Sequence, residues 1–185
     1  MSKARSKLFR GLLVAGVLFL AFSRVGMADE RSAREFQVKA AFLFHFSQFV
    51  EWPGEAFPRG DSPLVIGVIG RGDPFNGALE RAVRDKRVAD HPIVIAHYDS
   101  VAAMGACHIL FICDDQADAL DAILQKAGSG TLTVGDLDSF TERGGLVRFF
   151  PEDNKVRFEI NLEILRRSRL HISAKLLKLA KIVHE

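Results

Sequence analysis

The sequence predicts a single three-layer α/β domain, built on a mostly parallel sheet with an antiparallel C-terminal hairpin at its edge. Residues 64–69, 92–97 and 107–112 form short apolar runs, which are typical of strands covered on both faces. Helical segments alternate with these runs, and this alternation predicts parallel strands. The chain has 185 residues, of which 48% are hydrophobic, so it can form one core; disordered, collagen-like and disulfide-framework classes are excluded.

The first half of the predicted domain alternates helices and strands. Residues 36–52 lack a period of two and are rich in Ala, Leu, Gln and Lys, so we expect a buried helix that Pro53 ends. The strand at 64–69 leads to Asp73-Pro74, which predicts a helix capped by Asp73 and running to about Arg84. Strands at 92–97 and 107–112 follow.

The second half changes pattern after one more helix and strand. Asp114 or Asp115 caps an expected helix over 116–127, which Gly128 closes before a fourth strand at 131–134. After a short turn or helix at 138–143, strands at 146–150 and 155–160 flank a four-residue turn and predict a hairpin. Helical segments at 162–168 and 173–184, the latter capped by Ser173, complete the expected fold.

The N-terminal 28 residues have the layout of a secretory signal peptide. A basic start precedes the uncharged run 11–22, and Gly26 and Ala28 place small residues at positions −3 and −1 of a cut after Ala28. The alternative is a membrane anchor. Twelve residues of helix rise only about 18 Å, however, whereas the hydrocarbon core is about 30 Å thick. We therefore predict cleavage, export to the periplasm, no membrane span afterwards, and a mature domain over residues 29–185.

Cleavage changes the charge of the protein. The 157 residues that remain hold 20 basic and 23 acidic residues, a net charge of −3. Within them, residues 155–185 hold eight basic and three acidic residues, or +5, so the basic charge is concentrated at the C-terminal end. A nucleic-acid-binding domain is expected to be basic overall, so nucleic acid is not predicted as a partner.

Two glycine or aspartate motifs at strand ends invite functional interpretations. Residues 67–72 have the spacing G-x-x-G-x-G, which is not the dinucleotide fingerprint, and Asp73 adds a negative charge where a phosphate would bind; a structural turn is favoured. Asp114, Asp115 and Asp136 resemble part of an acidic receiver-type pocket, but helix capping explains the first two.

The histidines and cysteines do not form a recognisable site. His91, His97 and His108 lack a metal-binding spacing, and no catalytic arrangement is supported, so we expect no metal, no cofactor and no catalytic residues. Cys107 and Cys113 flank one strand, which places their Cα atoms about 20 Å apart, too far for a disulfide between them. The alternative is an intermolecular disulfide through one exposed cysteine.

The C-terminal segment 173–184 has lysines every third residue and apolar residues opposite them. It is expected to be a packed helix with a solvated basic face. The alternative is a helix that contacts anionic lipid or an acidic partner.

Six segments in order resemble the YfiR-like family of exported bacterial regulators, over about residues 35–184. They are VKAAFLFHFSQFVEWP at 38–53, CHILFI at 107–112, LTVGD at 132–136, Gly144-Gly145, VRFEIN at 156–161 and ISAKLLKLA at 172–180. The resemblance implies a non-catalytic periplasmic α/β protein that binds and represses the periplasmic domain of an inner-membrane diguanylate cyclase, which lowers cyclic di-GMP and biofilm formation. It also implies a possible homodimer and, in some relatives, other membrane sensors such as histidine kinases as partners.

A binding protein of this kind needs surface anchors, for which aromatic residues and Arg are the usual choice. Trp52, Phe57 and Arg59 lie around the proline-rich break after the first helix and are the candidate partner-binding residues. The alternative function is a periplasmic small-molecule-binding module, because Gly70, Asp114 and Asp136 lie at the sheet edge where ligands bind.

Overall fold

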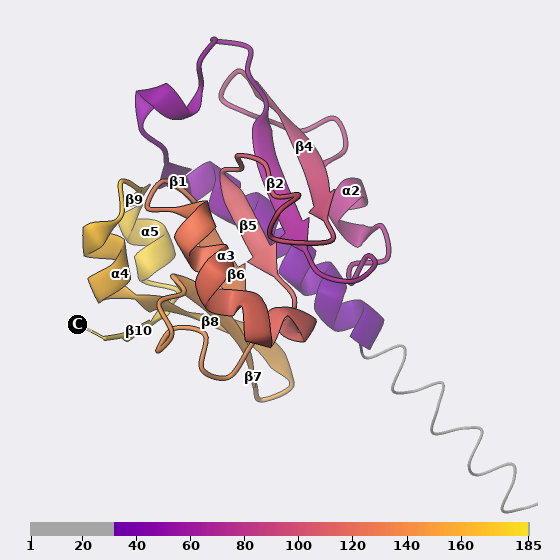
Figure 1. Ribbon diagram of the computed structural model, residues 1–185, viewed down its shortest axis with the longest axis vertical. Coiled ribbons are helices and arrows are strands. Elements are labelled where there is room, and N and C mark those ends of the chain that lie inside the picture. Colours follow the sequence, from indigo (N-terminus) through magenta and orange to yellow (C-terminus); the bar gives the residue numbers. More distant parts are fainter. Residues whose placement is uncertain (1–31, 185) are drawn as a thin grey trace, which may run out of the picture. The chain divides into compact units, whose positions relative to one another are not determined.

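A computed structural model of the chain describes residues 32–184, and its chain trace divides into the units Met1–Glu35 and Phe36–Glu185. The fold described here is that of the second unit (Figure 1). The predicted signal peptide, residues 1–28, lies outside the described residues. None of the helices within 32–184 has the length and hydropathy needed to cross a membrane.

Eight strands form the central sheet in the order β10-β8-β7-β6-β5-β2-β4-β3. The central strands β4, β2, β5, β6 and β7 are parallel to their neighbours, whereas β7–β8 and β4–β3 are antiparallel. The strands of this sheet are β2 (Leu64–Ile69), β3 (Arg87–Val88), β4 (His91–Tyr98), β5 (Ile109–Ile112), β6 (Leu132–Gly135), β7 (Val147–Glu152), β8 (Lys155–Asn161) and β10 (Lys181–Val183). The predicted α/β class and mostly parallel sheet are confirmed.

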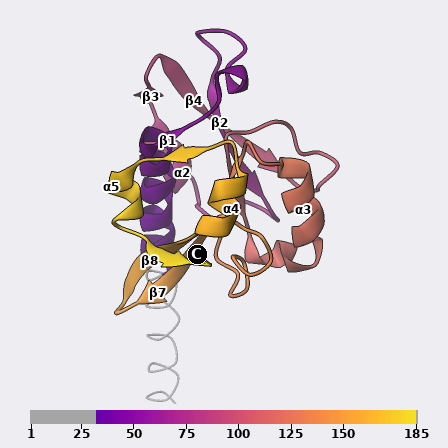
Figure 2. The same ribbon diagram turned by 90° about the vertical axis from the view of Figure 1, so that its left-hand side faces the viewer.

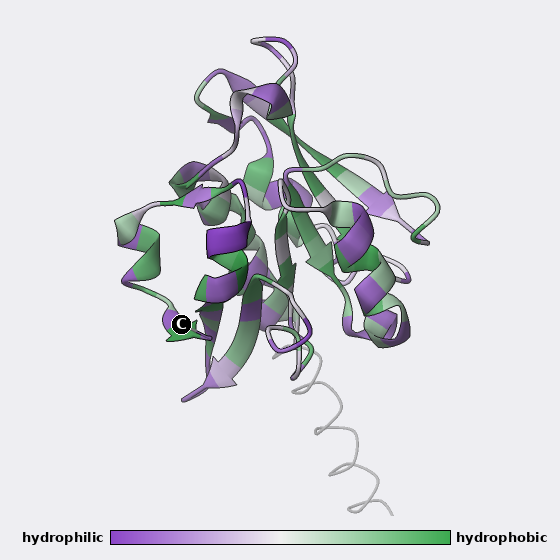
Figure 3. Ribbon diagram, turned by 60° about the vertical axis from the view of Figure 1, so that its left-hand side comes forward, coloured by the Kyte–Doolittle hydropathy of each residue, from purple (hydrophilic) through white to green (hydrophobic). Residues whose placement is uncertain are grey.

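Helices cover both faces of this sheet, which makes the three layers. The first described helix spans 32–49, and its residues 36–49 lie with α2 (Ala78–Val83) against one face; α3 (Leu120–Ala127) covers the other (Figure 2). Two apolar clusters result, one on each face. The hydropathy colouring shows the central strands as predominantly hydrophobic (Figure 3). Phe46 and Phe149 stack in the first cluster with ring centroids 5.8 Å apart.

Several predicted helices are shorter than expected. The helix expected at 36–52 ends at residue 49, because β1 (Val50–Glu51) pairs with β9 (His171–Ile172). The helix expected from Asp73 starts only at Ala78. Asp73 instead accepts hydrogen bonds from the backbone of Phe75 and Gly77, at 2.9 and 2.6 Å, and so closes a turn. The segment expected as a helix at 116–127 opens with a 3-10 helix, η2 (Asp114–Ala119), before α3.

The hairpin turn is also shorter than predicted. Glu152 pairs with Lys155, so only Asp153 and Asn154 lie outside the strands, with φ of 50° and 58°. Asp and Asn tolerate the left-handed region, and two such residues suit the tight turn of a right-twisted hairpin. The hairpin is not the outermost element, because β10 adds to β8 in parallel.

The predicted C-terminal helix 173–184 is wrong over most of its length. Ser173 does cap a helix, accepting from the Leu176 backbone N–H at 3.4 Å, but α5 covers only Ala174–Leu177 after α4 (Leu162–Arg167). Residues Lys181–Val183 pair instead with β8. The backbone groups at the edge of β8, together with β-branched side chains, favour a strand over local helix propensity.

Candidate functional site

A proline-rich segment between β1 and β2, residues 52–63, projects past the N-terminal ends of the parallel strands (Figures 1 and 2). It contains Pro53, Pro58 and Pro63 and only one short 3-10 helix, η1 (Gly54–Ala56). Proline lacks a backbone donor and restricts the residue before it, so this segment cannot continue either the helix or the strand. We call residues 52–63 the projecting segment.

The ring of Phe57 fastens this segment to the sheet. It lies between two imidazoles, with its centroid 3.9 Å from that of His91 and 4.4 Å from that of His108, at interplanar angles of 15° and 18°. Trp52 approaches His108 edge-on at 5.7 Å, and its indole Nε1 donates to the His108 carbonyl at 3.1 Å. The four side chains form an aromatic cluster that holds the first half of the projecting segment against the sheet.

His108 joins three parts of the chain through its ring. Its Nδ1 accepts from the backbone N–H of Val65 in β2 at 3.0 Å, so Nε2 carries the proton and donates to the carbonyl of Ala56 at 3.1 Å. Burial lowers the pKa of His108, and the neighbouring His91 lowers it further, although the bond to Ala56 acts in the opposite direction. The neutral ring is therefore the stable form.

The three predicted contact residues divide into two roles. Trp52 and Phe57 are half-buried and hold the segment in place, whereas the Arg59 side chain is 83% exposed and lies 3.7 Å from Asp61. Arg59 is thus the one of the three that is free to meet another molecule. The sequence presents His91 and His108 only as candidate metal ligands and does not predict their stacking. Their position at the starts of two strands was the available signal.

The opposite edge of the sheet, where the parallel strands end, is filled by protein side chains. Asp115 accepts from the Arg71 backbone N–H and from Arg71 Nε, each at 3.0 Å. Lys39, which is 4% exposed, donates to Asp136 at 2.7 Å. A Cβ on Gly70 would lie 2.5 Å from Cys113 Sγ, so Gly70 permits a close approach rather than a phosphate loop.

This edge shows no arrangement typical of a metal centre. No group of three or more His, Cys, Asp or Glu side chains within residues 32–184 is placed to hold a metal ion. The ion pair of Lys39 with Asp136 and that of Arg71 with Asp115 balance two of the carboxylates. Charge pairing within the protein thus accounts for Asp115 and for Oδ2 of Asp136, whereas Asp136 Oδ1 is buried without a hydrogen-bond partner within residues 32–184.

Both cysteines are free thiols. Burial raises the pKa of Cys107 to about 11. Burial, followed by the carboxylates of Asp115 and Asp136, raises the pKa of Cys113 to about 12. The expectation that they do not bond to each other is confirmed, and both thiols are in their unreactive, protonated form at neutral pH.

Comparison with known proteins places these features in a family. The chain resembles a crystal structure described as a conserved domain protein from Vibrio cholerae O1 biovar El Tor strain N16961, with a TM-score of 0.47 and 16% identity. The match covers 64% of this chain and 54% of the other, so it spans about half of that protein. No curated protein sequence matches the chain. The sequence profile of a regulatory family described as YfiR/HmsC-like matches residues 36–181, and the chain belongs to this family.

Proposed function

We propose that the protein is a non-catalytic periplasmic regulator that binds the periplasmic domain of an inner-membrane diguanylate cyclase and holds the cyclase inactive. The observation that carries the proposal is the family match over residues 36–181, since that family comprises periplasmic regulators of diguanylate cyclases. Export follows from the signal layout of residues 1–28. Repression lowers cyclic di-GMP and so limits biofilm formation.

The projecting segment is the surface that we assign to this role. Its base is fixed by the Phe57 stack, so docking it costs little conformational entropy. Its tip presents Arg59 to solvent, and Arg is one of the side chains that contribute most at protein interfaces. Trp52 and Phe57 act by positioning the tip, and Arg59 makes the contact.

A binding titration tests the proposal. The mature chain is titrated with the purified periplasmic domain of the diguanylate cyclase encoded beside its gene, and cyclic di-GMP is measured in cells with and without that gene. We expect a complex, and higher cyclic di-GMP after deletion. Arg59→Glu is expected to weaken the complex about tenfold or more. The control Arg166→Glu reverses another exposed charge, on α4, and is expected to leave affinity unchanged.

Two results would contradict the proposal: failure of the cyclase domain to bind, and unchanged cyclic di-GMP in the deletion strain. If the protein instead binds the periplasmic domain of a histidine kinase, the regulatory function stands and only the identity of the partner changes. Equal losses from Arg59→Glu and Arg166→Glu would keep the partner but remove the projecting segment from the interface.

A second candidate function, small-molecule binding, is favoured by a cavity of about 280 Å³ between α3 and α4. Its lining mixes apolar side chains, including Leu124 and Ile164, with the hydroxyl groups of Ser129 and Ser168. Thermal-shift screening with amino acids and nucleotides tests this function, because a ligand that binds the folded state raises its midpoint. Absence of any shift with these compounds would count against it.

A further inference from the structure

The strand β4 leaves most of its outer edge open. Its only partners within residues 32–184 are β2 on the inner side and the two-residue strand β3, which pairs with His91 and Pro92 alone. From Ile93 to Tyr98 no strand lies on the outer side. These six residues span about 20 Å.

The hydrogen-bond pattern identifies which backbone groups are open. The carbonyl of Tyr98 accepts from the Gly70 N–H at 3.2 Å, so Tyr98 is directed toward the β2 side. Alternate residues of a strand face the same neighbour, and Val94 and Ala96 therefore also face β2. The N–H and C=O groups of Ile93, Ile95 and His97 consequently point outward, and no strand within residues 32–184 pairs with them.

The surroundings of this edge favour a protein chain rather than water. Val94 is 41% exposed, although it is a large apolar residue in a strand. A groove of about 700 Å³ runs between β4 and the end of α2, with Ile93 and Ile95 in its wall. Long apolar edges are normally protected by a charged residue or a bulge within the strand itself, and Ile93–Ala96 contain neither.

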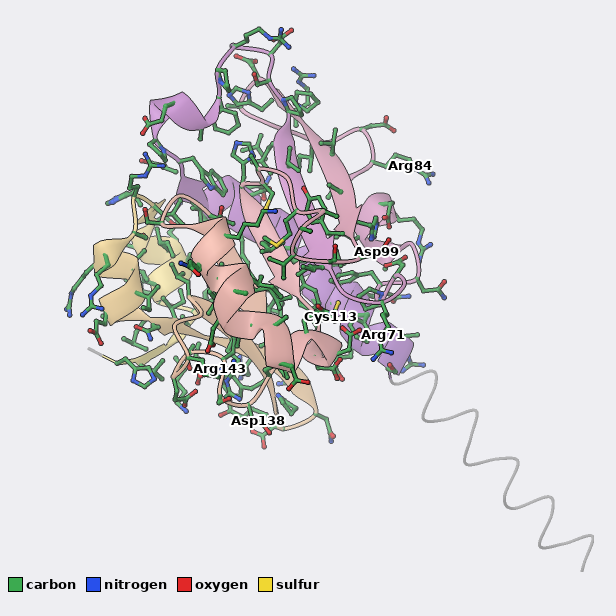
Figure 4. The ribbon with its side chains drawn as sticks, viewed as in Figure 1. Arg71, Arg84, Asp99, Cys113, Asp138 and Arg143 are labelled. Atoms are coloured by element: carbon green, nitrogen blue, oxygen red, sulfur yellow. The ribbon has the colours of Figure 1, made fainter. Side chains whose placement is uncertain are left out.

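The charges at the groove define the chemistry of what fits. The end nearest β3 is lined by four exposed charged residues, Arg84, Asp85, Lys86 and Arg87, and is basic overall. Arg84 and Lys86 form no ion pair within residues 32–184, and Figure 4 shows Arg84 directed away from the body of the protein. At the other end, Glu80 accepts from His97 Nε2 at 3.0 Å, while its second carboxylate oxygen, Oε2, is buried without a hydrogen-bond partner in this part of the chain. An acidic side chain suits the first end and a hydrogen-bond donor the second.

We propose that β4 is a strand-addition site: it takes up an extended segment of the partner as a ninth strand, with an acidic residue beside Arg84 and Lys86. Backbone groups of Ile93, Ile95 and His97 pair with the added strand, and apolar side chains of that strand cover Val94. Strand addition is an established mode of peptide recognition. The inference rests on the proposed function, since the segment belongs to the periplasmic domain of the membrane partner.

Amide hydrogen exchange tests this inference directly. In the free mature chain, the amides of Ile93, Ile95 and His97 are expected to exchange quickly, whereas those of Val94 and Ala96 are protected by β2. Saturation with the cyclase periplasmic domain is expected to slow exchange at the three open amides at least about tenfold. Side-chain docking alone would not produce this alternating pattern.

Two sets of variants complete the test. Ile95→Pro removes an outward N–H and leaves the β2 ladder intact, since edge strands tolerate proline there. Arg84→Glu with Lys86→Glu keeps the backbone unchanged and remains informative if the proline variant does not fold. Each is expected to weaken binding about tenfold or more. The matched control, Arg166→Glu with Lys178→Glu, reverses two exposed charges elsewhere and is expected to have no effect.

The outcomes separate this inference from the proposed function. If the cyclase domain binds without protecting the three amides, strand addition is wrong and the regulatory function stands. If the domain does not bind, a synthetic ten-residue peptide of alternating Val and Thr, with Glu at one end and Lys at the other, decides the question. Protection by that peptide supports the site, and its absence at millimolar peptide overturns it. Concentration-dependent protection without any partner would show a second copy at the edge and would also overturn the proposal.

Discussion

Replacing Phe57 by Ala is the sharpest test of how the projecting segment is held. The substitution removes two ring contacts, one with His91 at 3.9 Å and one with His108 at 4.4 Å. Each aromatic contact contributes about 0.5–1.5 kcal/mol beyond burial, and the half-buried ring adds a transfer contribution. We therefore expect the free energy of unfolding to fall by about 2 kcal/mol.

Urea unfolding of the mature chain measures this change, with limited proteolysis across residues 52–63 as a local readout. Proteolysis is expected to accelerate in Phe57→Ala, because the segment loses its attachment to the sheet. Arg59→Ala is the matched control in the same segment. Its side chain is 83% exposed, so its loss is expected to change stability by less than about 0.5 kcal/mol.

A change in stability of less than about 0.5 kcal/mol in Phe57→Ala, with an unaltered cleavage rate, would contradict this role of the ring. An Arg59→Ala variant as unstable as Phe57→Ala would contradict it as well. Either result would mean that Trp52 or the backbone fixes the segment without the stack. The division of Trp52, Phe57 and Arg59 into positioning and contact residues would then have to be abandoned.

Three further predictions concern buried titratable groups. Glu159→Gln is expected to lower the free energy of unfolding in urea by about 3 kcal/mol, because this carboxylate is only 3% exposed and pairs with the largely buried Arg148. The control Glu163→Gln changes an exposed carboxylate and is expected to cost less than about 0.5 kcal/mol. Burial holds the pKa of folded His108 below its ordinary value of 6.5, so its contribution to stability is present above about pH 6.5 and is lost as the pH falls through the folded pKa. Thermal unfolding midpoints that do not fall between pH 7 and pH 5 would contradict this. Cys107 and Cys113, with pKa values of about 11 and about 12, should react slowly with a thiol reagent at pH 8 until urea unfolds the chain. Rapid reaction of the native protein would contradict the raised pKa values.

The pKa of the buried carboxylate Glu159 is lowered like that of His108, but by its hydrogen-bond partners and not by burial. Burial raises the pKa of Glu159, yet hydrogen bonds from Arg148 and Thr141, at 2.8 and 2.9 Å, and the charge of Arg148 leave it lowered overall. A carboxyl group with a lowered pKa stabilises the fold at a pH above its unfolded-state pKa, and this stabilisation is lost as the pH falls through the folded-state pKa. Acid therefore weakens both the sheet network around Glu159 and the aromatic cluster around His108.

Some elements could be predicted from their own residues alone. The apolar run Leu64–Ile69 is a strand with the predicted bounds, and Gly128 closes α3 as predicted. A strand buried on both faces needs apolar side chains at every position, so its sequence is recognisable without its neighbours. Cys107 and Cys113 likewise flank the strand β5, as predicted, and both are free thiols.

Elements whose conformation depends on a partner distant in the sequence could not be predicted from local residues. Lys181–Val183 was expected to be helical, but the edge of β8 recruits it into the sheet; Val50–Glu51 similarly leaves the first helix to pair with β9. Local propensity differs between these states by only about 1 kcal/mol per residue, so the hydrogen bonds of a sheet edge decide.

The sequence by itself determined the signal layout, the α/β class, the separation of the two thiols and the family resemblance, because each of these depends on residue order alone. The tertiary structure decided what the polar and aromatic residues do. Phe57, His91 and His108 come from three separate segments and form one stack only because β4 and β5 flank β2. The open edge of β4 is likewise a property of strand order, which no local pattern encodes.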